Sequence, residues 1–138
     1  MNRSILFAVG LGCLSLLSAA AHAADESAAG DPAAGEKAFR KCAACHTLDG
    51  RSRVGPTLQG VIGRTAGTVE GFRYSPAVIS AGEAGVVWDS ETIFVFLEDP
   101  SAFLGQAIGQ DGAQTRKRNR YPDEQLRRDI AAFLSSRE

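Results

Sequence analysis

The sequence has almost no excess of charge of either sign and no long apolar stretch. Its 15 lysines and arginines are balanced by 16 aspartates and glutamates, which leaves a formal net charge of -1. This balance gives the chain no overall attraction for nucleic acid or for acidic lipid. The apolar run at residues 5–17 is shorter than the roughly 20 residues that a membrane-spanning helix needs. We therefore expect no nucleic-acid partner and no stable membrane insertion of the mature chain.

The apolar run instead fits a secretory signal peptide. Arg3 precedes it, and Ala21-His22-Ala23 follows it as a small-residue cleavage signal. We expect residues 1–23 to be removed, residues 24–30 to form a flexible leader, and residues 31–138 to form one domain in the periplasm. The alternative of a lipoprotein anchored at Cys13 is weakened by Gly10, which stands where such signals usually carry a large aliphatic residue.

Cysteine, histidine and methionine are scarce. The chain has three cysteines, two histidines and one methionine. Cleavage after Ala23 would remove one of each, so the mature chain would keep Cys42, Cys45 and His46 and would have no methionine. A structural zinc site needs four ligands, and these three residues cannot supply them alone.

The three remaining residues form a single motif, Cys42-Ala43-Ala44-Cys45-His46. The Cys-x-x-Cys-His spacing is the attachment signature of c-type haem. Two thiols add across the vinyl groups of the haem as thioethers, and the imidazole of the next residue lies below the ring and binds iron. A thioredoxin-type motif would need a nearby βαβ pattern, which the sequence lacks, and a disulfide between these two cysteines would be strained. We predict one covalent haem c, with His46 as iron ligand.

Helical signals alternate with unusually long loops. Expected helices run from Asp31-Pro32 into Cys45-His46, from Ser75-Pro76 to Gly82, over 90–99 between the cap Asp89 and the stop Pro100, and from Pro122 onward with an apolar stripe at Leu126, Ile130, Phe133 and Leu134. Residues 47–75 are glycine-rich loop, and residues 101–120 are expected to be irregular. A loop of this length is unusual inside a compact domain unless it wraps a cofactor. The prediction is an all-α fold with three main helices, a minor one and long loops.

Besides the haem motif, six short segments and their order along the chain resemble the class I cytochromes c, the bacterial cytochrome c2 and mitochondrial kind. These segments are Gly35-Glu36-Lys37-Ala38-Phe39, Gly55-Pro56-Thr57-Leu58, Gly63-Arg64-Thr65-Ala66-Gly67, Gly71-Phe72-Arg73-Tyr74-Ser75, Val86-Val87-Trp88 and Leu97-Glu98-Asp99-Pro100. The resemblance runs from about Gly35 to Phe133. It implies the small cytochrome c fold around one haem, and a monomeric electron carrier that is not an enzyme.

The resemblance also assigns roles to individual residues. The carbonyl of Pro56 would accept a hydrogen bond from the proximal histidine, His46. Arg64, Tyr74 and Trp88 would donate hydrogen bonds to a buried haem propionate, which needs such partners. Gly35 and Phe39 would pack against the last helix at Ile130 and Phe133.

One family feature is missing. The family usually supplies a methionine sulfur as second iron ligand from the loop before the last helix, and the mature chain would have no methionine. Counting back from the last helix puts Arg116 at its place, and counting forward from Pro100 puts Gly109 there. Neither can bind iron, since glycine has no side chain and arginine stays protonated. The second position is therefore open, filled by water, or held by a weaker ligand: Lys117, the only lysine in this loop, or Gln114, Asn119 or Tyr121. The main interpretation of residues 116–120 is a solvated basic patch for an acidic redox partner.

The function that these observations favour is electron transfer between periplasmic redox proteins. The main alternative is binding or sensing of small gases such as NO or CO at an open distal site. A weak peroxidase activity is a third hypothesis, and the absence of a second histidine from the mature chain counts against it.

Overall fold

The computed structural model describes residues 29–137, so the predicted signal peptide and most of the leader lie outside the described residues. Within 29–137 there are five helices: α2 Pro32–Phe39, α3 Pro76–Glu83, α4 Ser90–Glu98, α5 Pro100–Ile108 and α6 Glu124–Ser135. The only β pairing in this part is an isolated bridge between Thr65 and Val87. The prediction of an all-α fold with long loops is confirmed. None of these helices is long and apolar enough to cross a membrane.

Aspartates begin most of the helices. The side chain of Asp31 accepts a hydrogen bond from the Ala33 amide at the start of α2, and Asp89 forms a reciprocal capping box with Thr92 at the start of α4. Both helix starts were expected. The last helix begins at Glu124 with Asp123 as its cap. The sequence had predicted a start at Pro122, two residues earlier. Carboxylates at these positions satisfy amide groups that have no partner within the helix.

Two of the predicted boundaries are wrong. Residues 101–108 are not irregular but belong to α5, because Pro100 ends one helix and also occupies the first turn of the next, where a proline is well tolerated. The first helix ends at Phe39 rather than at His46. Residues 40–45 continue as turns, with the Cys42 amide bonded to the Phe39 carbonyl and the His46 amide bonded to the Cys42 carbonyl. These turns bring the haem motif out of the helix.

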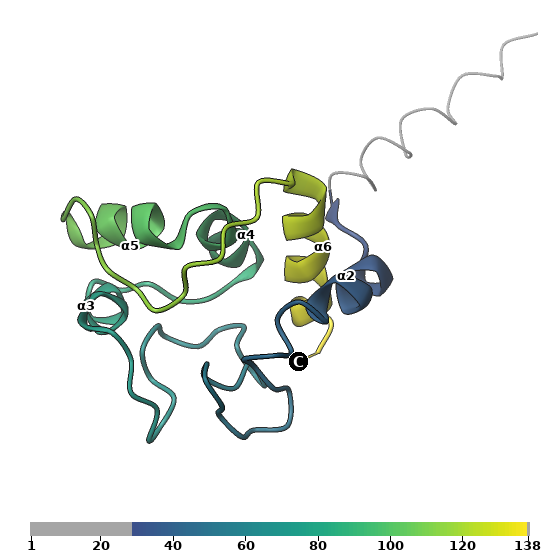
Figure 1. Ribbon diagram of the computed structural model, residues 1–138, viewed down its shortest axis with the longest axis horizontal. Helices are drawn as coiled ribbons and strands as arrows, with labels where there is room; N and C mark the ends of the chain where they lie inside the picture. Colours follow the sequence, from purple (N-terminus) through teal and green to yellow (C-terminus); the bar gives the residue numbers. More distant parts are fainter. Residues whose placement is uncertain (1–28, 138) are drawn as a thin grey trace, which may run out of the picture.

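Helices α2 and α6 cross in close contact (Figure 1). A Cβ atom on Gly35 would lie 1.9 Å from the Asp129 carbonyl oxygen and 2.7 Å from Cβ of Phe133. Beside this contact the rings of Phe39 and Phe133 lie 5.4 Å apart, and Ile130 is buried in the same cluster. The predicted packing of Gly35 and Phe39 against α6 is confirmed.

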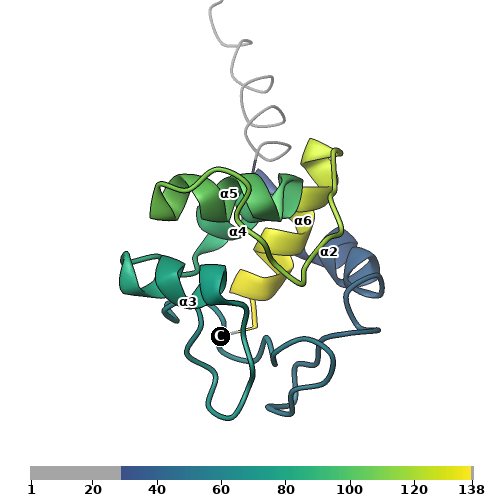
Figure 2. The same cartoon turned by 60° about the vertical axis from the view of Figure 1, so that its left-hand side comes forward.

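The apolar core is divided into two clusters. One lies among α2, α4 and α6 and includes Ile93 and Leu134, and the other lies around α3 and α5 and includes Val78 and Leu104. Trp88 packs against both clusters. Figure 2 shows α3 on the opposite side of the molecule from α2, with the long loops of residues 40–75 on one flank of the helices. The space between the two clusters can hold a group that is not part of the polypeptide.

The crossing predicts that Gly35→Ala destabilises the fold. Alanine normally stabilises a helix relative to glycine by roughly 0.5–1 kcal/mol, but here the added methyl group would overlap the backbone of α6, and overpacking costs about 1–3 kcal/mol. Urea denaturation of the purified protein should therefore show a lower free energy of unfolding. An increase in that free energy would contradict the packing described here.

Candidate functional site

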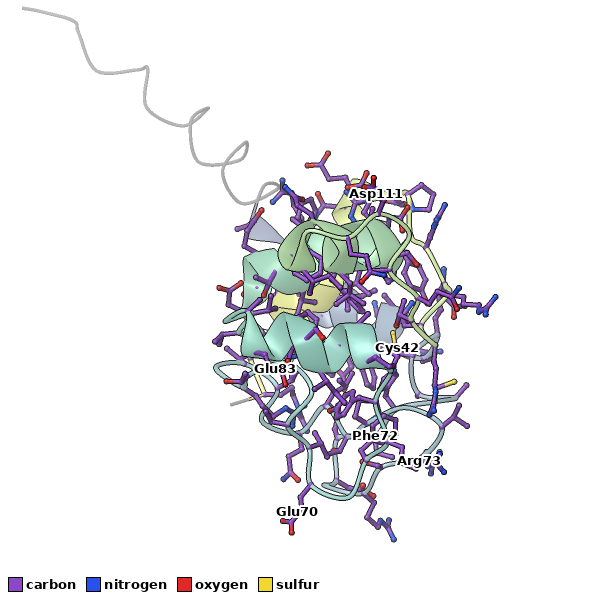
Figure 3. All side chains as sticks on the ribbon, turned by 90° about the vertical axis from the view of Figure 1, so that its left-hand side faces the viewer. Cys42, Glu70, Phe72, Arg73, Glu83 and Asp111 are labelled. Carbon is purple, nitrogen blue, oxygen red and sulfur yellow. The ribbon has the colours of Figure 1, made fainter. Side chains whose placement is uncertain are left out.

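A large apolar cavity lies between the two clusters. Its empty space, with the open mouth counted, is about 1380 Å³. Its walls come from the turns after α2, the long loops, Trp88, α4, the loop before α6, and α6 itself. Phe72 and Arg73, on the loop before α3, form the part of the wall that lies below that helix in Figure 3. The structure brings all the predicted site residues to this cavity: Cys42, Cys45, His46, Pro56, Arg64, Tyr74 and Trp88.

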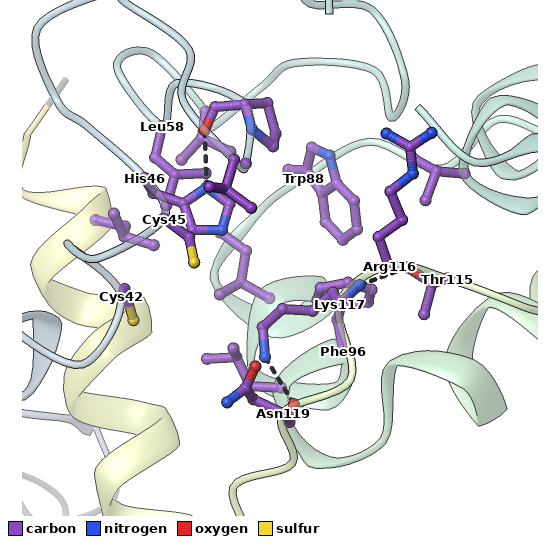
Figure 4. A pocket seen from close by; sticks show the side chains of 18 of the residues that line it. Cys42, Cys45, His46, Leu58, Trp88, Phe96, Thr115, Arg116, Lys117 and Asn119 are labelled. Atoms are coloured by element: carbon purple, nitrogen blue, oxygen red, sulfur yellow. Dashed lines mark hydrogen bonds between the residues drawn. The ribbon is translucent and has the colours of Figure 1, made fainter. Parts of the chain in front are cut away.

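The imidazole of His46 is fixed at one wall. Its Nδ1 donates a hydrogen bond to the Pro56 carbonyl at 2.7 Å, as expected from the resemblance. This bond leaves Nε2 directed into the cavity (Figure 4). Burial lowers the pKa of His46, so the ring is held in the neutral form that binds metals.

The loop closes behind the ring of His46. A Cβ on Gly55 would lie 2.3 Å from Cε1 of His46, and the Gly55 amide donates to the Cys45 carbonyl at 2.9 Å. Only a glycine leaves room for the imidazole at this point. The Gly55-Pro56 pair therefore both makes space for the histidine and supplies the acceptor that orients it.

The two cysteines lie on the same side of the cavity as His46 (Figure 4). Cys42 is half-buried and Cys45 is exposed, and neither is in a disulfide. Burial raises the pKa of the Cys42 thiol. Two thiols and a directed imidazole at one wall of an apolar cavity are the donor set that a c-type haem requires.

Polar groups gather at another part of the wall. Arg64 donates to the carbonyls of Thr57 at 2.8 Å and Gln59 at 3.0 Å, and its own carbonyl accepts from the Trp88 amide at 2.9 Å. The hydroxyl of Ser75 is buried at this cavity without a hydrogen-bond partner among the described residues. An unsatisfied donor at the wall fits a cofactor that brings acceptor oxygens, as haem does with its propionates.

The loop before α6 separates the residues that the sequence had grouped as a basic patch. Arg116, Arg118 and Arg120 are exposed, whereas Lys117 is half-buried. Lys117 lines the cavity together with Arg116, Asn119 and Tyr121. Of the other positions considered for the second ligand, Gly109 ends α5 and Gln114 is exposed, and neither belongs to the cavity wall.

Sequence reasoning missed most of the apolar wall. Phe72, Val78, Phe96 and Leu134 all line the cavity. Nothing in the pattern of a single apolar residue distinguishes a side chain that packs on the protein from one that packs on a cofactor. The motif at residues 71–75 and the apolar stripe of α6 indicated the correct segments of the chain. They did not show which of their side chains line the same cavity.

Comparison with known proteins agrees with this geometry. The family model for cytochrome c matches residues 32–138. The chain belongs to the cytochrome c family. Cytochrome c2 iso-2 of Rhodospirillum centenum is 46% identical over 113 residues, which cover 76% of this chain and 93% of that protein. A cytochrome c2 of Rhodopseudomonas palustris is 45% identical and covers 77% and 97% of the two chains.

The likeness extends to three dimensions. The structure of cytochrome c2 from Rhodospirillum centenum has a TM-score of 0.73 and 45% identity, and the match covers 78% of this chain and 98% of that one. The predicted small cytochrome c fold is confirmed. This cytochrome holds one haem c covalently and carries electrons, and it is not an enzyme. Its relatives do not favour the alternative of gas sensing.

The contact between Gly55 and His46 predicts that Gly55→Ala disturbs haem attachment in this cytochrome. The new methyl group would push the imidazole away from Pro56 and turn Nε2 out of line. We expect a lower haem-to-protein ratio and an altered absorption spectrum. Arg53→Ala is a suitable control, because Arg53 is exposed on the same loop and does not line the cavity, and it should retain the native spectrum. Equal spectra for both variants would contradict the role of Gly55.

Proposed function

We propose that this cytochrome shuttles single electrons between periplasmic redox proteins as a monomer, with its haem held by Cys42, Cys45 and His46. The observation that carries the proposal is the wall at which both thiols and the oriented imidazole meet one apolar cavity. When bound, the haem iron supplies a one-electron couple. The protein binds it, excludes water from it and sets its potential, and no proton or bond need change on the protein when one electron arrives from a donor and leaves to an acceptor.

Arg64, Tyr74, Ser75 and Trp88 are the residues that we assign to the propionates. They come from two loops, the one before α3 and the one between α3 and α4, and all four line the cavity. Burial raises the pKa of Tyr74, so its hydroxyl keeps the proton that a propionate would accept. A carboxylate taken from water needs several such donors, which explains why polar groups gather at an otherwise apolar wall.

The exposed arginines near the cavity suit an acidic partner. Arg116 and Arg118 lie on the loop before α6 and are exposed, and Arg116 also donates to the Arg73 carbonyl at 2.9 Å. Arg120 is the least available of the three, because it pairs with Asp99 at 3.0 Å. Opposite charges around a docking site mainly accelerate encounter. The periplasmic location rests on the expected cleavage after Ala23, which places Ala24 at the mature N-terminus.

Electron transfer is tested with the purified holoprotein. A potentiometric titration should fit a single one-electron step, and mixing the reduced protein with an oxidised periplasmic carrier should reduce that carrier in equal amount. The rate should fall as salt is added, because salt screens the attraction between the basic loop and its partner. A protein that cannot be reversibly reduced by one electron would contradict the proposal.

Covalent attachment is tested by removing both thiols. The wild-type protein should keep its haem through acid–organic extraction, and the double variant with Cys42→Ala and Cys45→Ala should release it, because no thioether can form. Cys13→Ala is the control, since its thiol is expected to leave with the signal peptide. Haem that extracts freely from the wild type would contradict the covalent assignment.

Removal of the haem should unfold much of the protein. The two apolar clusters would face an empty cavity, and the long loops pack little on one another. Because the haem packs in the cavity only in the folded chain, its contacts stabilise that state. Circular dichroism and proton NMR of haem-free chain should show reduced helicity and poor dispersion. A cooperative thermal transition with native-like helicity in that chain would contradict this expectation.

A further inference from the structure

We propose that the side-chain amine of Lys117 binds the haem iron on the face opposite His46. This inference rests on the proposed function, since it presupposes a haem attached beside His46. Lys117 belongs to the loop between α5 and α6 and lines the cavity. Figure 4 shows its side chain across the pocket from the His46 ring. The two side chains therefore approach the same space from opposite elements of the fold.

Few other side chains at the cavity can bind iron from that side. Residues 29–137 contain no methionine, and their one histidine is His46. Lys41 also lines the cavity but directly precedes Cys42, so it belongs to the wall where the haem is attached. The arginines of the wall stay protonated and have no lone pair to give.

The oxygen donors of the wall are poorer candidates. Burial raises the pKa of both Tyr74 and Tyr121, which keeps these phenols protonated and weakens them as ligands. The backbone carbonyl of Asn119 already accepts a hydrogen bond from Nζ of Lys117 at 2.6 Å. A neutral amine is a stronger donor to iron than a protonated phenol or a neutral amide, so Lys117 is left as the best ligand among the described residues.

Burial of Lys117 favours the neutral amine that iron needs, because the side chain is half-buried while its arginine neighbours are exposed. The Tyr121 ring, whose centre lies 4.9 Å from Nζ, instead favours the ammonium by a cation–π contact that the bond to iron must replace. Burial lowers the pKa of Lys117, and the thiols of Cys42 and Cys45 oppose that effect. Thioethers carry no charge, so attachment of haem removes the opposing influence.

The step is simple in chemical terms. The ammonium group gives one proton to water, and the freed lone pair of Nζ forms the bond to iron without changing the oxidation state of the metal. Two N–H groups remain on the amine. One of them can keep the hydrogen bond to the Asn119 carbonyl.

The loop that carries Lys117 is fixed on both sides. Upstream, Arg116 donates to the Arg73 carbonyl at 2.9 Å. Downstream, the Tyr121 amide donates to the Leu97 carbonyl at 3.0 Å, and the buried guanidinium of Arg127 donates to the Tyr121 carbonyl at 2.8 Å. A ligand held between two such points reaches the same place each time the protein folds, which a solvated lysine would not.

The decisive experiment compares the ferric and ferrous holoproteins of the wild type and Lys117→Ala. The wild type should be six-coordinate and low-spin by electron paramagnetic resonance and slow to bind CO when reduced. Lys117→Ala should become high-spin with water at iron and bind CO at least about tenfold faster, a factor that corresponds to about 1.4 kcal/mol in the barrier. Lys37→Ala, which removes an exposed lysine of α2 outside the cavity wall, and Arg118→Ala, which removes a neighbouring exposed charge, should both behave as the wild type.

Two further variants keep the test decisive if Lys117→Ala folds poorly. Lys117→Arg keeps the charge and bulk but cannot bind iron, so it should be high-spin. Lys117→Met should gain the weak near-infrared band of sulfur-bound ferric iron and a higher potential, because methionine ligation raises the potential. A high-spin wild type, a wild type that already has the sulfur band, or low-spin iron in both Lys117→Ala and Lys117→Arg would each overturn the assignment.

Haem content and one-electron reduction of the same samples separate the two proposals. If the wild type carries covalent haem and takes up one electron, but substitution of Lys117 leaves the spectra unchanged, only the ligand assignment fails. If the wild type carries no covalent haem, the proposed function and the ligand assignment fail together.

Discussion

The orientation of one imidazole is the constraint on which the rest of this structure depends. His46 must present Nε2 to the cavity in a single tautomer, and the hydrogen bond from Nδ1 to Pro56 fixes both the proton and the ring. That bond requires the loop to pass directly behind the ring, and only glycine at position 55 permits the approach. The turns after α2, the Gly55-Pro56 pair and the apolar wall in front are thus parts of one arrangement.

The helices position this arrangement by leaving a space between them. Gly35 lets α2 lie against α6, and α4 contacts both α6 and α5. Trp88 then joins the two apolar clusters. The cavity between the two clusters leaves apolar side chains without packing partners when the haem is absent. The haem completes that core, so the fold and the electron-carrying function depend on the same group.

Much of the site could be predicted from the sequence, because it is encoded locally. The five residues from Cys42 to His46 have one chemical interpretation, and the glycine-proline pair that orients the histidine follows within ten positions. What the sequence did not reveal depends on tertiary context. Pro100 is a stop signal and a start signal at once, so α5 was missed. Lys117 stands among three arginines, and only the folded loop shows that it is the half-buried one of the four.

Residues 29–137 contain no methionine, so we infer that the loop between α5 and α6 supplies a different ligand from the methionine that the resemblance implies. A methionine sulfur there favours ferrous iron, whereas an amine is a harder donor that favours ferric iron and lowers the potential. In this proposal the second iron ligand still comes from the loop between α5 and α6, but it is an amine instead of a methionine sulfur. The wall where the haem is attached keeps the motif from Cys42 to His46. We expect the potential to be set mainly across the cavity, by a loop that Arg116, Tyr121 and Arg127 hold in place.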